Sequence, residues 1–324
     1  MKIVAGLGSI DEYERFVKAG ADEFFCGYVP YSWSKKYGTV LPLNRREVLC
    51  YNVQLGAFEE LRILATMIKK YGKPVHLTFN SLYYIPEQYP EIAEIIRCCM
   101  TIGFHSYIVA DPALMVYLRE NNVNCELHIS GETGEINRCM VDAVAQFHPK
   151  RLIFHRKNTF EDMESVIKSC KNKQQNLLSK QMYESGKEAK ICEFEAFVLN
   201  ELCQFTGAFC NSLHCDEMGY LCRVPYVPGR KKAGKTELAL EVLTDEMEED
   251  ILDAPDYICG ETGCGLCALY QLQRAGITHL KLVGRGNYVN YMENDIRNLK
   301  QALKLLDCAK NEADFINKMK AELF

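Results

Sequence analysis

Short apolar runs alternate with amphipathic segments along the chain, and this alternation restricts the fold more than any other feature of the sequence. Strands joined by helices pair in parallel, because each helix carries the chain back to the edge where the next strand starts. The eight runs predicted as strands are residues 2–5, 22–27, 74–80, 106–110, 125–130, 151–155, 191–198 and 278–283. Eight strand–helix units in series predict an α/β fold, a closed (β/α)8 barrel of the TIM-barrel type.

Helices are predicted between these strands from apolar residues spaced three and four apart. They cover residues 9–19, 57–71, 86–101, 112–120, 135–147, 159–187 and 294–308. Ser9 and Thr159 stand at expected N-caps, because their hydroxyls can accept a hydrogen bond from a free backbone N–H. The stretch from Gly27 to Asn44, rich in Tyr, Ser and Gly, is predicted as a loop.

An open, doubly wound sheet is the alternative to a closed barrel. Such sheets often carry a glycine-rich dinucleotide fingerprint after the first strand. Here only the fragment Gly6-Leu7-Gly8 is present, so the sequence favours the barrel. We expect one barrel domain over residues 1–324, with a cysteine-rich, cluster-binding insertion at 199–270 between the seventh and eighth strands.

Composition and charge narrow the range of partners. Hydrophobic residues make up 48% of the chain and charged residues 25%, as in soluble globular proteins, and the net charge is -5. No basic tract supports binding of nucleic acid by charge. The N-terminus lacks the features of a signal peptide and no run is long enough to span a membrane, so we expect a cytoplasmic protein.

Polar or reactive side chains follow most of the predicted strands. In a (β/α)8 barrel the active site lies at the C-terminal ends of the strands. The side chains expected there are Cys26, Asn80, Asp111, Ser130, Glu132, Arg156, Asn200, Cys203 and Arg285. Their recurrence on successive strands predicts a shared binding pocket.

Seven of the 16 cysteines gather in one segment: Cys203, Cys210, Cys215, Cys222, Cys259, Cys264 and Cys267. In a reducing compartment such a group indicates metal or redox chemistry rather than disulfides. The scattered cysteines are expected to be small buried hydrophobic residues, and they are Cys98, Cys99, Cys125, Cys139, Cys170, Cys192 and Cys308.

The spacing of the gathered cysteines favours an iron–sulfur cluster over a structural zinc site. Zinc sites usually show paired Cys-x-x-Cys motifs, whereas this segment has one, formed by Cys264 and Cys267. Glycines among the cysteines give the backbone the freedom to bring several thiolates together. Zinc and a catalytic thiol remain the alternatives.

Three segments carry a family resemblance. AGADEFFCGY at 19–28 is similar to a family opening AGAD-x-x-Y-x-G, and FVLNELCQFTGAFC at 197–210 is similar to FVHGALCxxxSGRC. LKLVGRGNYV at 280–289 is similar to LKIEGRxxxxYV. Taken in this order along most of the chain, they resemble peptidase family U32, the collagenase-like peptidases.

The resemblance implies a barrel-like fold and a [4Fe–4S] cluster held by four cysteines. The expected ligands are Cys203, Cys210 and Cys222, with Cys264 as the fourth and Cys259 and Cys267 as its competitors. The expected substrate-binding residues are Arg46, Asn52, Asn80, Asp111, Ser130, Arg156 and Arg285. The arginines suit an anionic substrate or donor, because a guanidinium pairs with a carboxylate through two hydrogen bonds.

Two departures from the family pattern affect the same pocket. Leu199 stands where the family has His, and Val283 stands where it has Glu. Both changes remove a polar group, so the substrate of a relative is not carried over to this chain.

The resemblance implies an oxygen-independent hydroxylation, or a related modification, of a small molecule or an RNA base with an anionic oxygen donor. One alternative is a peptidase, a hydrolase, although the chain lacks Gly-x-Ser-x-Gly and His-Glu-x-x-His motifs. Another alternative is a non-catalytic, cluster-bearing subunit that supports a protein partner. A homo-oligomer is also compatible with the sequence.

Overall fold

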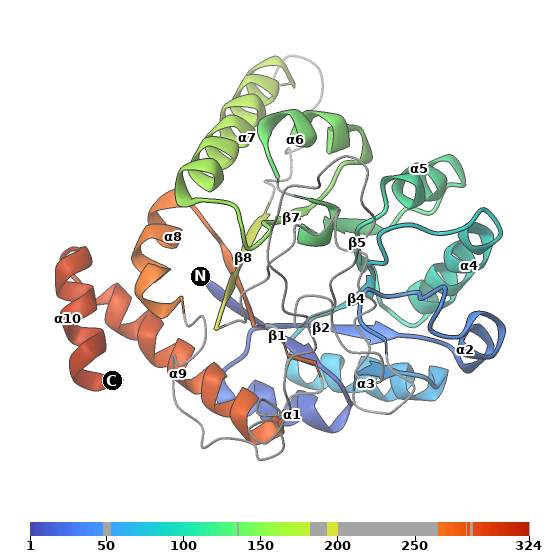
Figure 1. The fold of residues 1–324 in the computed structure, drawn as a ribbon, viewed down its shortest axis with the longest axis horizontal. Coiled ribbons are helices and arrows are strands. Elements are labelled where there is room, and N and C mark those ends of the chain that lie inside the picture. Colours follow the sequence, from blue (N-terminus) through green and yellow to red (C-terminus); the bar gives the residue numbers. More distant parts are fainter. Residues whose placement is uncertain are drawn as a thin grey trace, which may run out of the picture.

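The computed structural model describes residues 1–47, 53–134, 136–181, 193–199, 265–282, 284–285 and 288–323, with no side chains for 173–181. Its parallel strands form a barrel wrapped by helices (Figure 1). The barrel strands are β1 (Lys2–Leu7), β2 (Glu23–Tyr28), β4 (Val75–Phe79), β5 (Ser106–Val109), β6 (Glu126–Ile129), β7 (Arg151–Ile153), β8 (Glu193–Val198) and β9 (His279–Leu282). Within this described part, each matches one predicted strand.

Pairing between the first two strands closes the barrel. The strand order is β1-β9-β8-β7-β6-β5-β4-β2, and β1 also pairs with β2 in register Val4 with Glu23. The barrel is thereby confirmed and the open sheet is wrong. A further short strand, β3 (Gln54–Leu55), pairs with the C-terminal end of β2.

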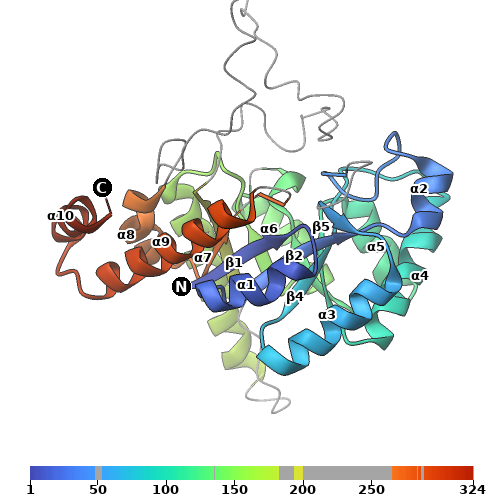
Figure 2. The ribbon, with the colours of Figure 1, turned by 90° about the horizontal axis from the view of Figure 1, so that it is seen from below.

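The helices cover the outside of the barrel, and α1 lies between α3 and α9 against β1 (Figures 1 and 2). They are α1 (Asp11–Ala19), α2 (Tyr31–Tyr37), α3 (Phe58–Tyr71), α4 (Gln88–Thr101), α5 (Pro112–Glu120), α6 (Arg138–Val144), α7 (Phe160–Gln181), α8 (Leu269–Ala275), α9 (Val289–Asp307) and α10 (Glu312–Glu322). No helix in the described part is long and apolar enough to cross a membrane.

One predicted helix start is confirmed, whereas another helix start and one loop differ from the sequence prediction. Thr159 caps α7 as predicted, since its Oγ1 accepts from the N–H of Asp162 at 3.1 Å. Ser9 does not cap α1; the Glu12 carboxylate reaches back and accepts from the Gly8 N–H at 2.7 Å. The predicted loop after β2 contains α2, which Trp33 anchors because its side chain is 2% exposed.

Apolar packing occupies two separate layers. The large layer lies between the strands and the helices. The small layer lies inside the barrel, where Val4, Phe25, Ile108 and Ile153 pack together with Phe197 against them. The rest of the described interior is polar, and this polarity is unusual because barrel interiors are dominated by branched apolar residues.

A buried ion network fills the barrel near the N-terminal ends of the strands. The Arg151 guanidinium lies 2.6 Å from Glu23 and 2.8 Å from Glu195, and the Lys281 ammonium lies 2.9 Å from Glu195. Burial alone would raise the pKa of Glu195, but Lys281 and Arg151 outweigh burial and lower it to about 2. Each charge therefore compensates the desolvation of the next.

Histidines extend this network across the barrel. His76 Nε2 lies 3.0 Å from Glu23, His76 Nδ1 lies 2.5 Å from the Ser106 hydroxyl, and His279 Nε2 lies 3.3 Å from Glu23. Burial lowers the pKa of His76 despite the neighbouring Glu23 carboxylate. Burial, followed by His76, also lowers the pKa of fully buried His128, whose ring centroid lies 4.5 Å from that of His76. Both rings are therefore neutral near pH 7.

We expect Glu195→Ala to lower the free energy of unfolding by about 3–5 kcal/mol, because it leaves the buried Lys281 ammonium without its carboxylate and removes one of the carboxylates that pair with Arg151. Glu59→Ala is the matched control, since Glu59 is 74% exposed and pairs with Arg62 at 3.7 Å. Its expected cost is below about 1 kcal/mol. Urea denaturation followed by circular dichroism compares the two variants. Equal losses in both would contradict the role given to the buried network.

Candidate functional site

Arg285 lies across the C-terminal end of the barrel, in a space that two glycines leave open. A Cβ on Gly27 would lie 2.5 Å from Arg285 Nη1, and a Cβ on Gly6 would lie 2.9 Å from Arg285 Cγ. Any larger residue at either position would place its Cβ against Arg285. The Arg285 side chain therefore fits across the strands only because both residues are glycines. Arg285 Nη1 donates to the Thr78 hydroxyl at 3.3 Å.

The charge of Arg285 is buried beside a second arginine. Its exposed fraction is 6%. Burial, and next the nearby Arg46, lower the pKa of Arg285 to about 10, so it stays protonated near pH 7. No described carboxylate lies within ion-pair distance of its guanidinium. A buried guanidinium that has another arginine nearby and no described carboxylate in ion-pair range favours an anion beside it.

Asn44 adds a polar group to the same place. Its side chain is fully buried, and no described residue hydrogen-bonds to its Nδ2 or Oδ1. Asn44 Nδ2 and Gln54 Cβ lie 3.6 and 3.1 Å from the point where a Gly27 Cβ would stand. A buried amide without a partner is costly, so this amide marks a position where a ligand or water is expected to bind.

Glu47 closes the loop that carries these residues. Its carboxylate accepts from the Asn44 N–H at 2.5 Å. Burial raises the pKa of Glu47 to about 8, although the backbone N–H groups of Asn44 and Leu43 and the nearby Arg285 act in the opposite direction. The side chain is therefore largely protonated at neutral pH, and it does not neutralise Arg285.

A second group of polar side chains joins three other loops at this end. Glu132 lies 3.5 Å from Arg45 Nε and 3.8 Å from Arg156 Nη1. The Arg156 guanidinium also stacks 4.4 Å from the ring centroid of Phe197, on β8. Glu132 is thus the acid that links the loops after β2, β6 and β7. We call Arg45, Arg46, Arg156 and Arg285 the mouth arginines.

The predicted substrate residues divide into two groups. Arg46, Arg156 and Arg285 come to the barrel mouth, and Asn80 holds the Arg45 loop there by accepting from the Arg45 N–H at 3.1 Å. Ser130 and Asp111 have capping roles, since Ser130 Oγ accepts from the Glu132 N–H at 3.2 Å and Asp111 from the Ala113 N–H at 2.8 Å. Asn52 lies outside the described residues, and substrate binding by any of these side chains stays a prediction.

Several residues at the barrel mouth were not predicted as site residues from the sequence. Asn44, Arg45 and Glu47 flank Arg46 in the polar run NRRE, a signal that could have identified them. Thr78, one residue before the end of β4, and the two glycines carried no such signal. Their importance depends on the position of Arg285, which follows each of them by more than 200 residues in the chain.

Most of the gathered cysteines lie outside the described residues, namely Cys203, Cys210, Cys215, Cys222, Cys259 and Cys264. Cys267 is described, and it is exposed in the 3₁₀ turn before α8. Among the described residues, no group of three or more His, Cys, Asp and Glu side chains could hold a metal ion. The proposed ligand set therefore stays a prediction.

The scattered cysteines are only partly as expected. Cys99, Cys125 and Cys170 are buried as predicted, and burial raises the pKa values of Cys99 and Cys125. The expectation of burial is wrong for three others, since Cys98, Cys139 and Cys308 are exposed. Cys98 lies on α4, and Cys308 directly follows the last residue of α9. Cys192 lies outside the described residues.

Comparisons with known proteins give a family match over nearly the whole chain. The model of peptidase family U32 matches residues 8–323. Among solved structures, the U32 peptidase Mk0906 is similar, with 10% identity, a TM-score of 0.40, and 61% of this chain and 68% of that chain covered. The YdjI aldolase from Escherichia coli K12 has 9% identity and a TM-score of 0.39, with 94% and 90% covered. A search of curated proteins found no significant match.

We expect the stability of the protein to fall as the pH rises from about 4.5 to about 8, partly because of Glu47. Over that window the unfolded chain loses the Glu47 proton while the folded protein keeps it. One such proton changes the free energy of unfolding by up to about 1.4 kcal/mol per pH unit. Below the window both states are protonated, and above it both are ionised.

Glu47→Gln removes this contribution, so the variant should gain stability over the wild type near pH 8 and little near pH 5. Urea denaturation at both values measures the difference. Glu120→Gln, on an exposed carboxylate of α5, is the matched control. A Glu47→Gln difference that is the same at both pH values would show that the carboxyl is not protonated in the folded protein.

Proposed function

Because this chain belongs to peptidase family U32, we propose that it is an iron–sulfur enzyme whose barrel mouth binds an anionic substrate or oxygen donor. The reaction is an oxygen-independent hydroxylation, or a related modification, of a small molecule or an RNA base. The observation that carries this proposal is the buried Arg285 guanidinium, with Arg46 nearby, beside an Asn44 amide to which no described residue hydrogen-bonds.

The mouth arginines provide the binding chemistry. A carboxylate or phosphate placed beside Arg285 and Arg46 would accept charge-assisted hydrogen bonds, which are shorter and stronger than neutral ones. The Asn44 Nδ2 amide group would donate to the same anion. Below them the apolar layer around Phe25 excludes water, and exclusion of water strengthens each electrostatic contact.

The proposed cluster ligands are Cys203, Cys210 and Cys222 with one of the three later cysteines. Strand β8 ends at Val198 and α8 begins at Leu269, and both positions are at the mouth end of the barrel, because helices run opposite to the strands. The insertion is thus attached beside the mouth arginines. A bound [4Fe–4S] cluster would supply one-electron transfer there.

The described cysteines differ in how well their thiols could bind an iron–sulfur cluster. Thiolates bind iron, and burial in apolar surroundings disfavours the thiolate. Burial raises the pKa of Cys26 to about 12, and it also raises that of Cys125, so these are poor ligands. Cys267 is exposed, so its thiol does not carry this cost of burial.

We expect strictly anaerobic purification to yield a brown protein with about four iron and four sulfide per chain. Cys203→Ser and Cys222→Ser should each lose most of the iron, because the cluster then lacks a thiolate. Cys308→Ser, on an exposed cysteine outside the insertion, is the control and should keep it. Iron and sulfide assays with paramagnetic resonance spectra measure both outcomes.

The same assays on serine variants of Cys259, Cys264 and Cys267 identify the fourth ligand. A colourless, iron-free wild-type protein from anaerobic cells would overturn the cluster. Peptide cleavage that survives iron removal would instead favour the peptidase alternative. Activity that appears only with a copurifying protein would favour the supporting-subunit alternative.

We expect Arg285→Gln to weaken binding of benzoate and phosphate about tenfold or more, because a charge-assisted hydrogen bond contributes about 1.5–3 kcal/mol. Gly27→Ala should weaken it as well, since the new methyl group displaces the guanidinium while both charges remain. Arg62→Gln, on an exposed arginine of α3, is the control. Titration calorimetry gives the affinities. Unchanged affinity in both mouth variants, or no binding of either anion, would exclude the anion site.

A further inference from the structure

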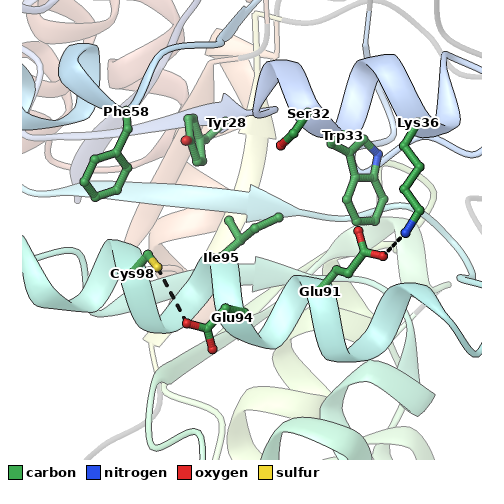
Figure 3. A pocket seen from close by; sticks show the side chains of 9 residues that line it. All are labelled: Tyr28, Ser32, Trp33, Lys36, Phe58, Glu91, Glu94, Ile95 and Cys98. Atoms are coloured by element: carbon green, nitrogen blue, oxygen red, sulfur yellow. Dashed lines mark hydrogen bonds and ion pairs between the residues drawn. The ribbon is translucent and has the colours of Figure 1, made fainter.

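A cavity of about 420 Å³ lies outside the barrel, between α2, α3 and α4 (Figure 3). Its volume is in the range of small-molecule sites, which measure about 300–1,000 Å³. The side chains that line it are Tyr28, Ser32, Trp33, Lys36, Phe58, Glu91, Glu94, Ile95 and Cys98. None of them belongs to the mouth, so this cavity is separate from the proposed anion site.

Three aromatic rings form part of the cavity wall. Tyr28 and Trp33 are 5% and 2% exposed, so both rings are held firmly by the fold. The Phe58 ring centroid lies 6.5 Å from that of Tyr28. The Trp33 indole N–H is buried and has no hydrogen-bond partner among the described residues. Aromatic faces carry negative potential and attract cations, most strongly when several rings face one ligand.

The charged residues on the wall leave an excess of negative charge. The Lys36 ammonium is paired with Glu91, which also accepts from the Tyr37 hydroxyl at 2.9 Å (Figure 3). That pair is internally neutral. Glu94, one helical turn further along α4, pairs at 3.5 Å with Arg97, which does not line the cavity, and it accepts from the Cys98 thiol at 3.8 Å. Glu94 therefore adds a carboxylate that a bound cation could approach.

We propose that this cavity binds a small organic cation, an ammonium group carried on an apolar or aromatic body. The apolar part packs against Ile95 and the rings, and the ammonium lies among the ring faces close to Glu94. An anion would meet both the Glu94 charge and the negative ring faces, so the cavity selects against it. The proposal does not depend on the function of the mouth.

The single tryptophan of the chain makes a direct test available, because all tryptophan emission comes from Trp33 on the cavity wall. Benzyltrimethylammonium is the cationic probe, benzyl alcohol the neutral one and benzenesulfonate the anionic one. Excitation of the tryptophan at the red edge of its absorption avoids the probes. We expect a saturable change of emission with the cation, at a concentration about fivefold or more below that needed for either other probe.

Two variants separate the charge from the rings. Glu94→Gln should weaken binding of the cation about twofold to fivefold and leave binding of benzyl alcohol unchanged, because a partly exposed pair contributes up to about 1 kcal/mol. Phe58→Leu keeps an apolar side chain but removes one ring face, so it should also weaken the cation. Glu59→Gln, an exposed carboxylate of α3 that does not line the cavity, is the matched control.

Circular dichroism of each variant establishes that it is folded before titration. Cation preference that is lost in Glu94→Gln and kept in Glu59→Gln supports the proposal. Emission that does not change with the cation, equal affinity for all three probes, or an unchanged cation affinity in Glu94→Gln overturns it.

Discussion

The buried ion network at the base of the barrel is the constraint to which the rest of the interior is adjusted. Arg151, Glu195 and Glu23 are enclosed by strands on all sides, so their charges must be compensated by each other. They take up the interior near the N-terminal ends, where a barrel ordinarily packs apolar side chains. The apolar interior is thereby reduced to the thin layer around Phe25 and Ile108.

That layer separates two polar regions of different character. The Lys281 ammonium lies 3.6 Å from the Phe25 ring centroid, and the Arg285 guanidinium lies 5.9 Å from it. Lys281 has its carboxylate in Glu195, whereas Arg285 has a hydroxyl as its described partner. The base is consequently a closed, neutralised structure, and the mouth keeps a positive charge that a ligand can meet.

The mouth and the outer cavity have opposite electrostatics, although the loop after β2 connects them in sequence. Arginines and a raised carboxyl pKa at Glu47 make the mouth positive. Aromatic rings and Glu94 make the outer cavity attractive to cations. In a (β/α)8 barrel the strand–helix loops carry such specificity while the strands keep the frame. The long segment between β2 and α3 supplies residues to both places.

The sequence alone determined the order of the barrel strands and of most of the helices between them, because apolar periodicity and capping are local and act over a few residues, but it missed α2, α8 and α10. Asp111 before Pro112, and Thr159 before α7, are examples of such local signals. It did not determine which strand residues face inward. In the sequence, three charged residues stand in otherwise apolar strands: Glu23, Arg151 and Glu195. Only closure of the barrel brings these distant charges into contact. Likewise, the sequence did not show that Arg285 lies across Gly27. The two residues are far apart in the chain, and only the closed barrel brings them into contact.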